Sequence, residues 1–144
     1  MYDRPTVSEL IDAARMHLES AVIPAVRADR KLYFQTLVAI NVLKIAGREL
    51  ALAPQQAETE WAGLNLLENR DAPAPANLTD LQAAIHERNK TLCAAIRAGE
   101  YDREQHQSLL LAHVMATTTA QLEVANPRLL QTMAAEDAAQ EDVG

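Results

Sequence analysis

The chain has 144 residues and a formal net charge of −7; alanine forms the largest part of its 49% hydrophobic residues, and 3% of its residues are aromatic. Alanine favours helix, and the scarcity of aromatic residues argues against sheet, so the composition predicts an all-α protein. No basic run is present to neutralise phosphates, which excludes nucleic acid and anionic membranes as expected partners.

The first predicted helix begins at Thr6. Thr6 and Glu9 have the spacing of a capping box, in which each side chain satisfies the other's free backbone donor. Apolar residues then recur at steps of three and four, as on one face of a helix. Pro24 should kink or end this helix, and residues 27–30 are expected to form a turn.

Two further helices are predicted before a linker. Residues 31–52 are apolar on most sides, which is typical of a helix that is central in its bundle or covered by a second subunit. Pro54 fits the first position of a third helix over residues 54–68. The prolines between residues 70 and 76 favour an extended, semi-rigid connection.

The second half of the chain predicts two more helices. Asn77 or Thr79 can cap a fourth helix, which Gly99 would end in a left-handed conformation. A fifth helix over residues 103–125 should stop at Asn126, because a residue that precedes proline disfavours helical geometry.

These elements predict a compact all-α bundle of about five helices. We expect one domain over residues 1–130, with Leu129 and Leu130 packing back on it. Residues 131–144 are acidic and rich in alanine, and they are predicted to form a flexible tail. Neither a secretory signal nor a long apolar run is present, so we expect a cytoplasmic protein.

The sequence contains little recognisable catalytic chemistry. None of the four histidines follows a glutamate by three positions, as di-iron bundles require, and His106 and His113 are too far apart along one helix to share a metal. We therefore expect neither a metal nor a cofactor. Cys93, the single cysteine, is interpreted as a small buried apolar residue.

A line of polar residues on the second predicted helix is more informative. Asn41, Lys44 and Arg48 follow one another at steps of three and four, with Glu49 beside them. In a structural interpretation, the long side chains reach solvent and Arg48 pairs with an acid. In a functional interpretation, the line is a polar seam that binds a partner or an anionic ligand.

Several short motifs, in this order and spacing, resemble those of one protein family. They are Arg4-Pro5, Glu9-Leu10, Asn41, Gly47-Arg48-Glu49-Leu50, Ile96-Arg97-Ala98-Gly99-Glu100-Tyr101-Asp102, Leu111-Ala112-His113, Leu122 and Asn126-Pro127-Arg128. The chain is similar, up to about Leu130, to the bacterial all-helical domain-of-unknown-function family 6285.

The resemblance implies an accessory role. Members of that family are small proteins typically encoded beside acyl-CoA dehydrogenases and kinases that resemble aminoglycoside phosphotransferases. The neighbouring kinase phosphorylates a hydroxyacyl-CoA, and the small protein is expected to bind it or to be needed for its activity. The positions of this chain that match the family motifs are Arg48, Glu49, Arg97, His113, Asn126 and Arg128.

We therefore expect a non-catalytic partner subunit, which docks through an apolar face of the second or fifth helix and is anchored by Arg48. Two alternatives remain open at this stage. The protein could bind an acyl or acyl-CoA ligand between helices, or it could be an enzyme that uses His113 with Glu49 or Glu123 as acid and base. A homodimer is compatible with each of these.

Overall fold

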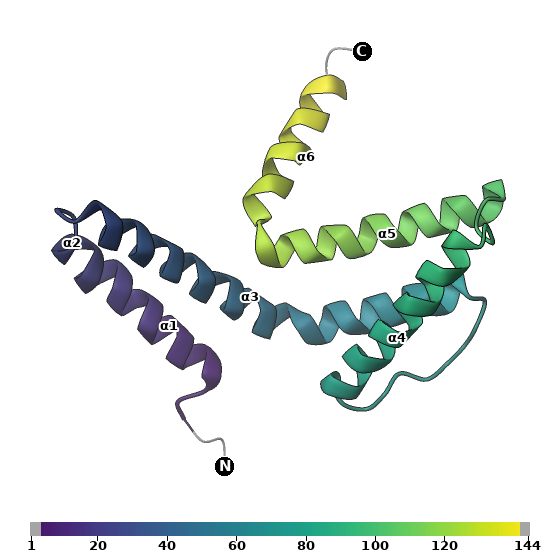
Figure 1. Ribbon diagram of the computed structural model, residues 1–144, viewed down its shortest axis with the longest axis horizontal. Coiled ribbons are helices and arrows are strands. Elements are labelled where there is room, and N and C mark those ends of the chain that lie inside the picture. Colours follow the sequence, from purple (N-terminus) through teal and green to yellow (C-terminus); the bar gives the residue numbers. More distant parts are fainter. Residues whose placement is uncertain (1–3, 142–144) are drawn as a thin grey trace. The chain divides into compact units, whose positions relative to one another are not determined.

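The computed structural model describes residues 4–141, and that part of the chain is helical, with no strand (Figure 1). A first helical run comprises α1 (Val7–His17), a π-helical turn η1 (Leu18–Val22) and α2 (Ile23–Ala25). It is followed by α3 (Arg30–Leu67), α4 (Leu78–Arg97), α5 (Glu104–Ala125) and α6 (Pro127–Glu141). The predicted all-α class and the number of helical segments are confirmed for the described residues.

The chain divides into two compact units, an N-terminal unit of residues 1–52 and a C-terminal unit of residues 53–144. The boundary falls within α3, so each unit contains part of that helix. The single domain expected over residues 1–130 stays a prediction, and the two units are described in turn.

The start of the N-terminal unit follows its local sequence signals. The Thr6 hydroxyl accepts a hydrogen bond from the Glu9 N–H at 3.2 Å, and the Thr6 N–H donates to the Glu9 carboxylate at 2.8 Å. This confirms the predicted capping box. Pro24 lies in α2, directly after the π-helical turn, and the Ile23 N–H reaches back to the Leu18 carbonyl. The helical run ends at Ala25, as the proline predicts.

Helix α3 differs from the sequence prediction. The two helices expected over residues 31–52 and 54–68 are one helix of 38 residues, with Pro54 inside it. A proline within a helix costs about 3 kcal/mol, because it removes one hydrogen bond and crowds the preceding turn. Pro54 is exposed, while Ala53 and Ala57 on either side of it are buried. Packing on both sides of the proline therefore keeps the helix continuous.

Within the N-terminal unit, α1 runs alongside the first part of α3 (Figure 1). Ile11 lies 3.9 Å from the point where a Cβ on Gly47 would stand, and Glu19 forms an ion pair with Lys44. Since Glu19, later in this helical run than Ile11, meets an earlier residue of α3, the run and α3 are antiparallel. Ile40 faces the interior and is 5% exposed.

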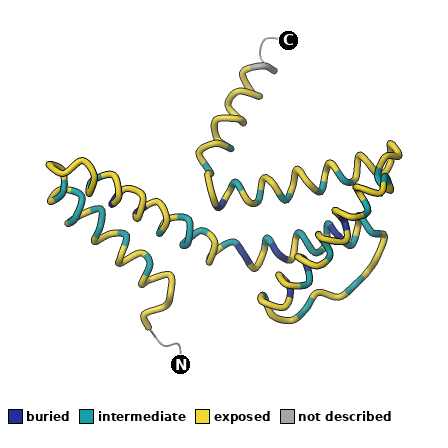
Figure 2. The backbone as a smooth tube through the Cα atoms, viewed as in Figure 1, coloured by how far each residue is buried: buried dark blue, intermediate teal, exposed yellow. Residues whose placement is uncertain are grey.

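The other side of α3 in this unit remains open (Figure 2). Four large apolar residues there are exposed, and we call them the α3 stripe: Phe34, Leu37, Val38 and Val42.

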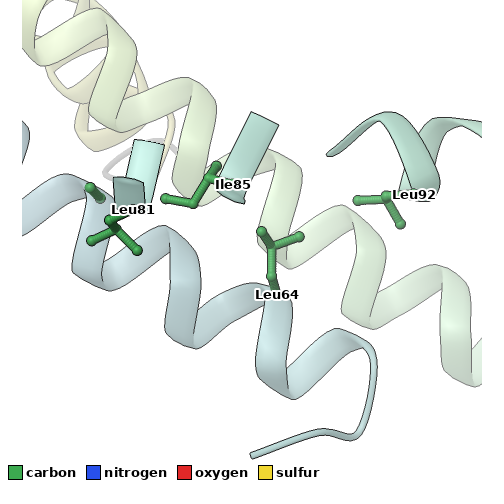
Figure 3. Close-up of a cluster of buried hydrophobic side chains, with 5 residues drawn as sticks. Leu64, Leu81, Ile85 and Leu92 are labelled. Carbon is green, nitrogen blue, oxygen red and sulfur yellow. The ribbon is translucent and has the colours of Figure 1, made fainter. Parts of the chain in front are cut away.

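The core of the C-terminal unit lies between α3 and α4 (Figure 3). Its buried members are Ala57, Leu64, Leu81, Ile85 and Leu92, and Leu64 is fully enclosed. The half-buried side chains that pack against this cluster are Trp61, Leu67, Leu78, Tyr101 and Leu110.

Both ends of α4 agree with the sequence. Of the two predicted capping residues, Asn77 is the one used, since its side chain accepts a hydrogen bond from the Asp80 N–H at 2.8 Å. Gly99 follows the helix with a φ of +80°, the left-handed conformation that glycine adopts without strain.

Helix α5 packs antiparallel on the part of α3 that belongs to the same unit. The Gln56 amide donates to the Ala120 carbonyl at 2.9 Å, and farther along α3 Gly63 lies against the His113 ring. The opposite side of α5 carries three exposed apolar residues, which we call the α5 stripe: Leu111, Val114 and Met115.

The chain continues as α6 after Asn126. Leu130 is half-buried, whereas residues 131–139 are all exposed. Because these side chains are exposed, residues 131–139 add nothing to the core. This exposure is what the acidic composition predicts, although the backbone is helical to Glu141. Residues 142–144 of the predicted tail lie outside the described part of the chain.

Candidate functional site

An open groove of about 250 Å³ runs between α1 and α3 in the N-terminal unit. Two residues of the predicted polar seam, Lys44 and Arg48, line it. The complete lining is Ser8, Asp12, Arg15, Leu43, Lys44, Gly47, Arg48 and Ala51.

A network of ion pairs borders this groove. The Glu19 carboxylate lies 2.9 Å from Lys44 Nζ and 2.8 Å from Arg15 Nη1, and Arg15 also reaches Asp12 at 3.3 Å. The hydrogen bond from Lys44 holds the pKa of Glu19 below its ordinary value. Exposed pairs of this kind contribute little to stability individually. Lys44 is therefore paired with an acid of the preceding helical run, and its side chain is 46% exposed.

The predicted seam is not a single site. Asn41 does not line the groove; it is exposed, and it follows Phe34 by seven positions and Val38 by three, along the α3 stripe. Glu49 is also exposed and lies outside the groove lining. The groove therefore brings together Lys44 and Arg48 alone among the predicted seam residues.

The most organised polar cluster is centred on Arg88, in the C-terminal unit. Its side chain is 11% exposed, and its guanidinium lies 4.3 Å from the centre of the Trp61 ring. Arg88 Nε donates to Glu68 at 3.1 Å, and Nη1 donates to the Asn65 side chain at 3.0 Å. Arg88 Nη2 lies 3.0 Å from Glu68 without an aligned hydrogen bond, so that contact is electrostatic. The cluster thus joins α3 to α4.

The same cluster holds the connection between the two helices. Trp61 Nε1 and Asn65 Nδ2 both donate to the Ala72 carbonyl, at 2.8 Å and 2.9 Å. This connection is non-helical over residues 70–75, as its prolines predicted. Two α3 side chains therefore fix its backbone.

Two pKa values are shifted in and beside this cluster, those of Glu68 and Tyr101. Burial alone would raise the pKa of Glu68, but the hydrogen bonds and charges of Arg88 and Arg70 outweigh it, so the pKa is lowered. Burial, together with the negative charge of Glu68, raises the pKa of Tyr101. Glu68 is consequently a carboxylate held ionised by two arginines.

His113 packs beside this cluster. Its Nδ1 atom lies 2.6 Å from the point where a Cβ on Gly63 would stand, so the absence of a side chain at Gly63 permits the contact. Burial lowers the pKa of His113; the charge of Arg88 acts in the same direction and that of Glu60 opposes it. His113 is therefore a half-buried histidine that favours its neutral form.

The acid–base pairs expected for His113 are not found within this unit. Glu123 lies ten residues farther along α5, which is about 15 Å of helix, and its carboxylate accepts a hydrogen bond from Gln56 at 3.2 Å. Glu49 belongs to the N-terminal unit. The carboxylate whose charge acts on His113 is Glu60, which accepts a hydrogen bond from Asn89 at 2.8 Å.

The remaining predicted site residues do not converge. Arg97 is exposed in the last turn of α4, where a positive charge favours the helix dipole. Asn126 ends α5, and its side chain accepts a hydrogen bond from the Leu129 N–H at 3.3 Å, which confirms the expected terminating role. Arg128 is exposed on α6. The 22 residues of α5, about 33 Å of helix, separate its start, near Arg97, from Asn126.

The interpretation of Cys93 as a buried residue is wrong, because the side chain is exposed. Leu92 is buried in the core, and one further residue turns the helix by about 100°, which carries Cys93 to the solvent side. Among the described residues, no three histidine, cysteine, aspartate or glutamate side chains are grouped so that they could hold a metal ion. No helix in this part of the chain is both long enough and apolar enough to cross a bilayer.

Sequence reasoning missed Arg88, although the sequence contains a signal for it. Leu81, Ile85, Arg88 and Leu92 follow one another at steps of four, three and four. Arg88 thus occupies an apolar position of an amphipathic helix, where a charged residue needs a partner.

Within the described residues, the fold and these sites define an all-helical protein with exposed apolar helix faces and a half-buried arginine–carboxylate cluster. The family model "Domain of unknown function (DUF6285)" matches residues 24–129, about three quarters of the chain. The chain belongs to this family. The match spans α3, α4 and α5, whereas the N-terminal motif residues from Arg4 to Leu10 lie outside it. No curated protein and no solved structure matches the chain significantly.

Proposed function

We propose that this protein is a non-catalytic accessory subunit of an acyl-CoA-metabolising enzyme. The family resemblance points most directly to a hydroxyacyl-CoA kinase of the aminoglycoside-phosphotransferase type, and after it to an acyl-CoA dehydrogenase. The observation that carries the proposal is the α5 stripe, whose members Leu111, Val114 and Met115 are 61%, 44% and 56% exposed.

The chemistry of the α5 stripe suits a protein partner. Its residues are spaced by three and four, so they lie along one side of the helix, and Thr118 continues the line without adding a charge. Covering apolar surface is worth about 25 cal/mol per Å². Interface centres are poor in charge and enriched in methionine, and this stripe carries no charge and includes Met115. A partner could therefore cover the stripe without burying an unpaired charge.

The scattering of the candidate site residues supports an accessory rather than a catalytic role. Lys44 and Arg48 line a groove in the N-terminal unit, while Arg97 and Asn126 lie near opposite ends of α5. His113 has Glu60 as the carboxylate that acts on it, not a partner from the family motifs. Arg48, the anchor expected from the sequence, lines the groove, and the uncharged α5 stripe needs no charged anchor.

Binding of an acyl ligand has less support. The groove of about 250 Å³ lies below the roughly 300–1,000 Å³ of ligand pockets. Its side chains Asp12, Arg15 and Lys44 are also engaged in ion pairs instead of enclosing an apolar chain.

Co-purification with the kinase encoded beside this protein tests the proposal. We expect a tagged kinase to retain the wild-type protein and to lose Leu111→Asp and Met115→Asp variants. The matched control is Leu66→Asp. Leu66 is 69% exposed, and it lies on the side of α3 opposite the buried Leu64, so the same substitution there should leave binding intact. Clean separation of the wild-type protein from the kinase, or equal retention of all variants, would overturn the proposal.

A further inference from the structure

We draw no further inference here: the strongest candidate, the surface patch of exposed apolar side chains that forms the α3 stripe of the N-terminal unit, carries nothing, because nothing in the structure shows what covers it.

Discussion

Replacing Gly63 by alanine would test the packing of α5 on α3. Alanine is the better helix former by about 1 kcal/mol, so an exposed site would gain that stability. Here the added Cβ would stand 2.6 Å from His113 Nδ1 and 3.2 Å from Cε1. The imidazole ring is rigid and half-buried, and overpacking of this kind costs about 1–3 kcal/mol. With the helix gain subtracted, we therefore expect Gly63→Ala to lower the free energy of unfolding by up to about 2 kcal/mol.

Urea denaturation at neutral pH measures this difference, and the His113→Ala background gives the matched comparison. Once the ring is removed, nothing opposes the helix preference of alanine. Gly63→Ala should then raise the free energy of unfolding by about 1 kcal/mol. The effect of Gly63→Ala on the free energy of unfolding thus changes sign between the protein with His113 and the His113→Ala background. If Gly63→Ala stabilises the protein that retains His113, the contact between these two residues is not as described.

Three further predictions concern the polar cluster and its surroundings. Arg88→Met should lower the free energy of unfolding, measured in urea, by about 2–3 kcal/mol, because it leaves the half-buried Glu68 with only the exposed Arg70 as a partner. The control, Arg97→Met at an exposed site, should change it by less than about 0.5 kcal/mol. Equal effects of the two substitutions would contradict the role of the cluster. Burial lowers the pKa of His113, so the unfolded chain takes up the proton at a higher pH than the folded chain does. The free energy of unfolding should therefore fall as the pH drops below about 6.5, the ordinary histidine value. His113→Gln should flatten this pH dependence, and an unchanged pH dependence would refute the lowered pKa. Cys93 should react fully with a thiol reagent in the native protein without denaturant, since it is exposed; slow reaction that speeds up only on unfolding would restore the buried interpretation.

Local sequence signals predicted the ends of the elements well. Thr6 caps α1, Asn77 caps α4 and Gly99 follows α4 in the left-handed conformation, because each depends on a few neighbouring residues. Pro54 was misread as the start of a new helix, since a proline at a first position and one inside a helix have the same local sequence. The burial of the neighbouring alanines, which keeps α3 continuous, depends on tertiary packing.

The candidate sites were harder to predict than the fold. The polar seam included Lys44 and Arg48, which both line the groove, but spacing along one helix did not reveal that α1 provides the other wall. Arg88 was overlooked because its acidic partner, Glu68, lies twenty positions earlier, in the turn that follows α3. Whether a charged residue is solvated or paired depends on such distant contacts, which helical periodicity does not contain.

The rate at which the neighbouring kinase phosphorylates a hydroxyacyl-CoA, measured with and without this protein, tests the accessory role most directly. We expect saturable stimulation by the wild-type protein and by Leu66→Asp, and loss of that stimulation with Met115→Asp. A kinase that is equally active in the absence of this protein, across the whole range of added protein, would contradict the account.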